Sequence, residues 1–275
     1  MFVHSFRAGI ALWAAFLVAG TTAVALAQQG DVAAQRLADS PRHHEWVDVP
    51  RPDGRAVRSF LAFPEVSEPA LAVVVIHENK GLTDWVRSVA DSLAEKGFVA
   101  IAPDLLTGAG PEGGNTDSFP APDAATQAIY KLRAEDVMAD LAAAADYARQ
   151  LDAANGKVAA IGFCWGGGQS FQLAAHAPEL AAALVFYGSA PDEATLARID
   201  VPVFGFYGEN DQRITGQLPR VSAAMERLGK WFEPVVYQGA VHGFLRAGEQ
   251  PCARAADRDA AEAARARVLE ILRSL

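Results

Sequence analysis

Short apolar segments alternate with longer segments of mixed polarity through most of the chain. The short segments are apolar at consecutive positions and rich in Val, Ala and Phe, which is typical of parallel strands covered on both faces. This pattern predicts strands at 71–77, 98–103, 157–163, 182–188, 201–208 and 233–239. It predicts helices at 85–96, 124–150, from the end of the 157–163 strand to about 176, 215–228 and 257–275. The alternation indicates an α/β fold with a single doubly wound, mostly parallel sheet flanked by helices.

Two further segments complete the predicted domain. Residues 45–65 are expected to form a hairpin that turns at Pro52, Asp53 and Gly54, because Pro presets φ and Gly tolerates positive φ. A loop rich in Gly and Pro follows the 98–103 strand and extends to about residue 122. We find no internal repeat or linker, and therefore expect one domain over 45–275.

The N-terminus has the order of a secretory signal peptide. Arg7 precedes an uninterrupted apolar run at 10–19, and Ala25 and Ala27 form an A-x-A cleavage site. We expect cleavage after Ala27, a leader at 28–44, and a periplasmic or secreted protein without stable membrane insertion. An uncleaved anchor is the alternative, although the apolar run is shorter than the ~20 residues that span a bilayer.

The composition of the chain bears on which partners, disulfides and metal sites are to be expected. The chain has 275 residues and a net charge of −9, and no basic block offsets that charge, which argues against nucleic acid. Only two cysteines are present, Cys164 and Cys252, and the sequence leaves open whether they form a disulfide. An H-E-x-x-H zinc site fails because Gly81 stands where its second histidine would be. We expect no metal or organic cofactor, and a monomer is favoured.

One glycine-flanked cysteine stands where a strand is followed by a helix. Gly162, Cys164 and Gly166 have the spacing of a nucleophile elbow with cysteine in place of serine. The tight turn would place Cys164 at the start of a helix, where the helix dipole favours a thiolate. The amide of Trp165 would then face a developing oxyanion. A buried structural cysteine in a Gly-rich turn is the alternative.

A base and an acid follow the cysteine in the order used by α/β-hydrolases. Asp211 comes just after the 201–208 strand, and His242 just after the 233–239 strand. His242 is the only histidine well placed to act as a base. Glu209 is a weaker candidate for the acid.

From about residue 45 to the C-terminus, the chain resembles the dienelactone hydrolase family of the α/β-hydrolase superfamily. The resemblance rests on "IHENKGL", "APDLL", "YKLRAEDVMADLAAAADYAR", "GKVAAIGFCWGG" and "HGFLR". Cysteine in the elbow is its specific mark. The resemblance implies an α/β-hydrolase fold and a carboxymethylenebutenolidase-like ester hydrolase that acts on a small ester or enol-lactone.

The resemblance also assigns roles to individual residues. It implies a catalytic triad of Cys164, His242 and Asp211, an acidic residue beside the thiol, oxyanion-hole amides, and two substrate-binding side chains. The acidic residue is Glu78, and the oxyanion-hole amides are those of Asn79 and Trp165. The substrate-binding side chains are Arg246, for a substrate carboxylate, and Tyr130. Thr126 departs from the family pattern, because a second carboxylate-binding arginine would stand there.

The role expected of Glu78 has a physical basis. A carboxylate beside a thiol disfavours the thiolate, so the resting cysteine would be protected from oxidation until substrate displaces the carboxylate. Glu78 as an ordinary helix-entry residue, and Arg246 as a solvated loop residue, are the alternatives. For the whole protein, a broad carboxylesterase or thioesterase and a catalytically silent binding protein on this fold remain the rival hypotheses.

Overall fold

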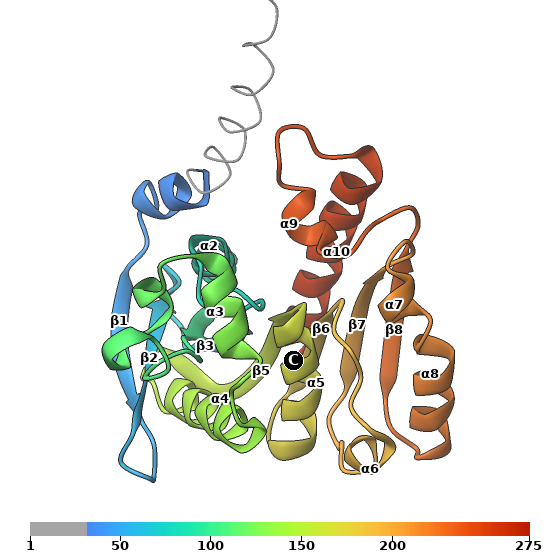
Figure 1. Cartoon of the computed structure of the whole chain (residues 1–275), viewed down its shortest axis with the longest axis horizontal. Helices are drawn as coiled ribbons and strands as arrows, with labels where there is room; N and C mark the ends of the chain where they lie inside the picture. The colour runs from blue at the N-terminus through green and yellow to red at the C-terminus, as the bar shows by residue number, and fades with distance from the viewer. Residues whose placement is uncertain (1–31) are drawn as a thin grey trace, which may run out of the picture.

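A computed structural model describes residues 32–275 (Figure 1). The predicted signal peptide at 1–27 and the first residues of the predicted leader lie outside the described residues. Residues 32–38 are helical, and the first strand of the sheet begins at His44. None of the helices in the described part of the chain combines the length and apolar character needed to cross a membrane.

The centre of the molecule is one eight-stranded sheet with the order β1-β2-β4-β3-β5-β6-β7-β8. β1 and β2 form the predicted antiparallel hairpin, β2 pairs antiparallel with β4, and every later pairing is parallel. The strands are β1 (His44–Pro50), β2 (Ala56–Ala62), β3 (Ala70–Ile76), β4 (Val99–Pro103), β5 (Ala154–Phe163), β6 (Ala182–Phe186), β7 (Val203–Gly208) and β8 (Phe232–Tyr237).

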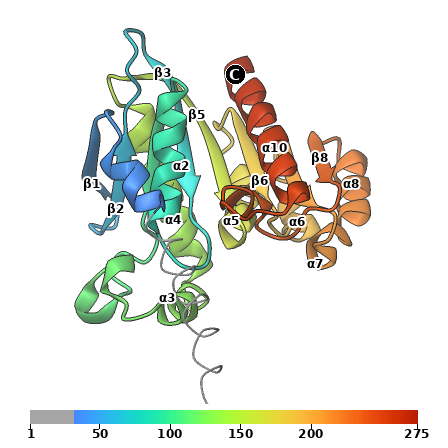
Figure 2. The same cartoon turned by 90° about the horizontal axis from the view of Figure 1, so that it is seen from above.

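Helices cover both faces of this sheet (Figures 1 and 2). Alternate residues of β3 show why its sequence is apolar throughout: Val74 belongs to the buried apolar cluster on one face of the sheet, and Val73 belongs to the cluster on the other face. The long helices are α2 (Asp84–Glu95), α4 (Ala134–Arg149), α5 (Trp165–His176), α8 (Leu218–Arg227) and α10 (Ala255–Ser274). The predicted α/β architecture is therefore observed.

The single helix predicted over 124–150 is wrong. The structure has two helices there, α3 (Pro122–Ile129) and α4, separated by residues 130–133. Buried α3 side chains pack in a small separate cluster with Leu106, whereas α4 packs on the main sheet. The two helices therefore bury different surfaces, which one straight helix would not reach.

The structure also contains several short helical turns that the sequence pattern did not predict. The Gly- and Pro-rich loop contains two 3₁₀ turns, η1 (Pro111–Gly113) and η2 (Thr116–Ser118). The helix predicted at 215–228 is observed as α8, which begins at Leu218 and has Pro219 in its first turn, and the short helix α7 (Gln212–Thr215) precedes it. Two more single-turn helices are α6 (Glu193–Leu196) and α9 (Phe244–Ala247).

The end of the predicted leader is bound to α2 through a buried carboxylate. Asp91 accepts hydrogen bonds from Ser40 Oγ at 2.6 Å and from Arg42 Nε at 2.7 Å, and His44 Nε2 lies 2.7 Å from the same carboxylate. Burial alone would raise the pKa of Asp91, but the bonds from Arg42, Ser40 and His44 outweigh it and lower that pKa. This cluster, called here the Asp91 clamp, ties residues 40–44 to the domain.

Candidate active site

The cysteine occupies a strained turn between β5 and α5. Cys164 has φ of 56° and ψ of −114°, a conformation that costs a non-glycine residue about 1–3 kcal/mol. A methyl group at Gly162 would lie 2.0 Å from the Gly166 carbonyl oxygen, and one at Gly166 would lie 2.3 Å from the His77 carbonyl oxygen. Glycine is therefore required on both sides, as the spacing of the motif predicts.

The structure brings the predicted base and acid to this cysteine. His242 Nε2 lies 3.1 Å from Cys164 Sγ, and His242 Nδ1 lies 2.5 Å from Asp211 Oδ2. The three residues follow β5, β7 and β8, whose carboxyl ends meet at one edge of the sheet. The histidine bridges a thiol and a buried carboxylate, which is the geometry of a nucleophile, a base and an orienting acid.

The same contacts control the charge of the histidine. The hydrogen bond to Cys164 raises the pKa of His242 most, burial opposes it, and the hydrogen bond to Asp211 raises the pKa further. The imidazolium is therefore stabilised between two groups that are anionic when deprotonated. Glu209, the weaker candidate for the acid, instead accepts a hydrogen bond from the Gly239 amide at 2.8 Å and braces the loop before His242.

Glu78 and Arg246 form an ion pair at the edge of the site. Arg246 Nε lies 3.0 Å from Glu78 Oε2, but the N–H does not point along this line, so the contact is ionic rather than an aligned hydrogen bond. Glu78 is buried, and the Arg246 guanidinium also lies over the Trp85 ring at 6.0 Å. The arginine predicted to bind a substrate carboxylate thus already neutralises a carboxylate of the protein.

The two amides predicted as oxyanion donors are not used in the hydrogen bonding of the described fold. Among the described residues, neither the Asn79 nor the Trp165 amide donates a hydrogen bond to a protein acceptor. The Asn79 side chain donates to the Tyr130 hydroxyl at 3.4 Å, and Tyr130 is exposed. Thr126, in the position of the missing arginine, bonds the Pro122 carbonyl within α3.

A cavity of about 290 Å³ opens over the cysteine. Its lining includes Cys164, Trp165 and Tyr130, all predicted as site residues, and also Tyr187 and Arg213, which sequence reasoning missed. Arg213 forms no ion pair with any carboxylate of the described residues, in contrast to Arg246. The one feature of the sequence that could have indicated Arg213 is its position two residues after Asp211.

Tyr187 is the more unusual of these two residues. It has φ of 40°, it is buried, and its ring meets His242 edge-on at a centroid distance of 5.0 Å. Its hydroxyl has no hydrogen-bond partner among the described residues. Burial raises the pKa of Tyr187, so this hydroxyl keeps its proton and remains a donor. No sequence motif indicated this residue.

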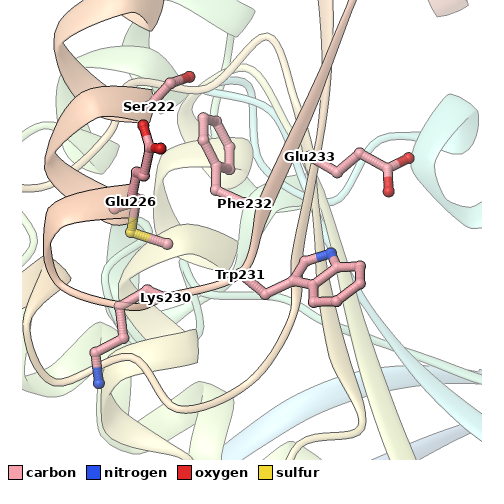
Figure 3. A pocket seen from close by; sticks show the side chains of 7 residues that line it. Ser222, Glu226, Lys230, Trp231, Phe232 and Glu233 are labelled. Carbon is pink, nitrogen blue, oxygen red and sulfur yellow. The ribbon is translucent and has the colours of Figure 1, made fainter.

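A second hollow, of about 450 Å³, lies beside β8 and α8 (Figure 3). Trp231, Glu226 and Lys230 line it, but it has no nucleophile next to a base, so it is not a candidate for the catalytic centre.

Both cysteines are free thiols, and Cys252 is exposed. Residues 32–275 contain no cluster of three or more His, Cys, Asp or Glu side chains suited to a metal ion.

Comparison with known proteins matches most of the chain to one family. The model of the "Dienelactone hydrolase family" matches residues 57–275. A Saccharolobus solfataricus protein described as "Putative carboxymethylenebutenolidase" is 32% identical over 253 residues, which cover 80% of this chain and 95% of that protein. The mouse "Carboxymethylenebutenolidase homolog" is 28% identical over 211 residues, covering 73% of this chain and 81% of the relative.

Solved structures agree with this match. A dienelactone hydrolase-like promiscuous phosphotriesterase from metagenomic libraries has a TM-score of 0.70 and 26% identity, covering 85% of this chain and 98% of that one. An esterase from Pyrobaculum calidifontis has a TM-score of 0.62 at 17% identity, covering 92% of each chain, and supports the fold alone. The predicted fold class, an α/β-hydrolase sheet, is confirmed.

Proposed function

Because the chain belongs to the dienelactone hydrolase family, we propose that it hydrolyses a small carboxylic ester or enol-lactone with Cys164 as nucleophile, His242 as base and Asp211 as orienting acid. The observation that carries this proposal is His242, which lies 3.1 Å from the Cys164 sulfur and 2.5 Å from the Asp211 carboxylate. The cavity of about 290 Å³ over the sulfur supports a small substrate.

The reaction has two halves. His242 Nε2 takes the Cys164 proton, the sulfur attacks the carbonyl carbon, and the resulting oxyanion accepts hydrogen bonds from the Asn79 and Trp165 amides. The C–O bond then breaks and the leaving oxygen takes the proton from His242. Water, deprotonated by His242, attacks the thioester, and the C–S bond breaks to restore the thiol with release of the carboxylic acid.

The role that the family resemblance assigns to Glu78 concerns the charge beside the thiol. A carboxylate beside a thiol disfavours a second negative charge, and in the structure Arg246 compensates the charge of Glu78. A substrate that draws Arg246 toward itself changes this balance beside Cys164. Protection of the resting thiol suits the proposed periplasmic location, where an exposed thiolate would be oxidised.

A carboxylate on the substrate has two arginines available to it. Arg246 must leave Glu78 to bind one, whereas Arg213 lines the cavity without an ion pair among the described residues. We therefore expect Arg213→Ala to raise KM for a substrate with a carboxylate more than for its neutral analogue. Equal changes in both KM values would contradict a role of Arg213 in substrate choice.

The proposal is tested by turnover of p-nitrophenyl acetate and of an enol-lactone. Cys164→Ala should abolish both activities, and iodoacetamide should inactivate the wild type, since the thiolate is the nucleophile. Cys252→Ala is the matched control, because it removes the other free thiol at an exposed position, and it should behave as wild type. Esters cleaved with no preference for lactones would favour a broad esterase, and binding without turnover would favour a silent binding protein.

Export is the remaining part of the proposal. Arg7, the apolar run at 10–19 and Ala25-Leu26-Ala27 support cleavage after Ala27. Intact-mass analysis of protein recovered from a bacterial periplasm should give a chain that begins at Gln28. Recovery of the uncleaved chain from the cytosol would contradict it.

A further inference from the structure

We propose that His77 is a positioning residue that holds both oxyanion donors in place. This inference rests on the proposed function, because it concerns the amides of Asn79 and Trp165 that would stabilise the tetrahedral intermediate. The reaction described above does not use His77, and the zinc motif that begins with it is incomplete.

The His77 ring is fixed at both of its nitrogens. The side chain is fully buried after β3, with Nδ1 2.7 Å from the Glu78 carbonyl oxygen and Nε2 3.2 Å from the Leu105 amide nitrogen. A backbone N–H can only donate, so Nε2 accepts and Nδ1 carries the proton. Burial lowers the pKa of His77, which agrees with a neutral ring.

The bond from Nδ1 sets the direction of the Asn79 amide. The Glu78 carbonyl and the Asn79 N–H belong to the same peptide unit, which is planar and trans, so they point in opposite directions. A carbonyl held toward the His77 ring therefore keeps the Asn79 N–H pointing away from it. Rotation of this peptide would move the donor out of line with the substrate oxygen.

The same histidine also contacts the side chain of Trp165, the residue that carries the other donor. Its ring stacks on the Trp165 indole with centroids 5.6 Å apart and planes 17° from parallel. Its carbonyl oxygen lies only 2.3 Å from the position that a methyl group on Gly166 would occupy, so the end of β3 is in close contact with the first turn of α5. His77 thus belongs to the segment that carries the Asn79 amide and is in contact with the segment that carries the Trp165 amide.

Substitutions that keep one hydrogen bond at a time separate this role from simple filling of the core. In His77→Asn the amide nitrogen takes the place of Nδ1 and can still donate to the Glu78 carbonyl. In His77→Gln the side-chain oxygen can reach the place of Nε2 and accept from Leu105, but the donor to Glu78 is lost. His77→Phe retains the stacked ring and loses both bonds.

We expect His77→Gln and His77→Phe to lower kcat for p-nitrophenyl acetate by about 10–100-fold with KM nearly unchanged, since removing an oxyanion donor costs about 10²–10³ in kcat. His77→Asn should keep kcat within about threefold of wild type. His176→Gln is the matched control, because His176 also bonds a backbone carbonyl, at 2.8 Å from Gln172 O, but on the surface. It should have no effect.

Alkylation of Cys164 by iodoacetamide distinguishes an effect of the variants on the oxyanion donors from an effect on the nucleophile, because alkylation forms no oxyanion. Its rate should be the same in wild type and in all His77 variants. A rate that falls together with kcat, or a His77→Asn variant as slow as His77→Gln, would overturn the inference. Wild-type protein that turns over no ester would overturn the proposed function itself, and the inference with it.

A measurement on the wild-type protein keeps the inference falsifiable if a His77 variant does not fold. In ¹⁵N-labelled protein the His77 ring should carry its proton on Nδ1 and remain neutral across the pH range of activity. A neutral ring with its proton on Nε2 would remove the bond to Glu78, and a charged ring in that range could no longer accept the bond from Leu105. Either result would overturn the inference.

Discussion

Replacing Arg246 with methionine should destabilise the protein through the carboxylate that it leaves behind. Methionine retains most of the length and apolar stem of arginine but lacks the charge. Glu78 lies 3.0 Å from Arg246 Nε, and its side chain is only 9% exposed. In Arg246→Met this carboxylate stays buried without its counter-ion.

The size of the effect follows from the exposure of the pair. Breaking a fully buried ion pair by removing one partner costs about 3–5 kcal/mol. Here the arginine side chain is 40% exposed and the N–H is poorly aligned, so water screens the pair. We expect a loss of about 2 kcal/mol in the free energy of unfolding, which corresponds to a fall in Tm of roughly 4–8 °C for a domain of this size.

Urea unfolding of four proteins measures the pair itself. These are the wild type, Arg246→Met, Glu78→Gln and the double variant, which together form a double-mutant cycle. Because the double variant has neither charge, it should recover most of the stability lost in Arg246→Met. The cycle also cancels the contact between the guanidinium and the Trp85 ring, which both arginine-free proteins lack.

A coupling energy below about 0.5 kcal/mol would refute the reasoning, since distant sites are additive within that range. The guanidinium would then not be paired with Glu78 in solution, and Arg246 could bind a substrate carboxylate without competition from Glu78. A coupling near 2 kcal/mol means that a substrate must compete with Glu78 for the arginine. KM for an acidic substrate should then fall in Glu78→Gln.

Three further predictions concern the triad, the elbow and the leader. Asp211→Asn should lower kcat/KM by about 10²–10⁴-fold. It should also lower the pKa of His242, because the hydrogen bond to Asp211 helps to raise that pKa. An unchanged His242 pKa in an NMR titration would contradict this. Gly162→Ala should lower the free energy of unfolding in urea by about 2–3 kcal/mol, because the new methyl group would lie 2.0 Å from a backbone oxygen. Gly168→Ala is the control and should change it little, because the nearest atom to its methyl group would be 3.4 Å away. The pKa of Asp91 is lowered on folding, so the ionised carboxylate stabilises the folded state. This contribution to the free energy of unfolding is fully present above the unfolded pKa and is lost as pH falls through the folded pKa. The stability difference between wild type and Asp91→Asn should therefore shrink from pH 7 to pH 3, and a constant difference would contradict the clamp.

The elements that sequence predicts well are those fixed by local chemistry. The strand patterns, the hairpin at Gly54 and the glycines around Cys164 follow from side-chain size, burial and backbone φ, which neighbouring residues determine. The order of Cys164, Asp211 and His242 along the chain then sufficed to bring them together, because each follows a parallel strand that ends at the same edge.

The parts that sequence did not predict depend on contacts between distant segments. The break between α3 and α4 follows from two separate apolar clusters, not from a helix-breaking residue. The pairing of Glu78 with Arg246 joins positions far apart in sequence, so no local pattern reports it. Tyr187 belongs to an apolar strand end, and only its backbone conformation and its unpartnered hydroxyl distinguish it from a core aromatic residue.

The strand order has a consequence for the nascent chain. From β5 onward each new strand is added beside the previous one, so the most recently added strand is always the edge of the growing sheet. β7 is buried and apolar, and as an edge it would expose a template for pairing with other chains. β8 carries Pro234, which has no N–H to offer a further strand. A chain truncated before β8 should therefore aggregate, whereas the complete sheet ends at a strand poorly suited to extension.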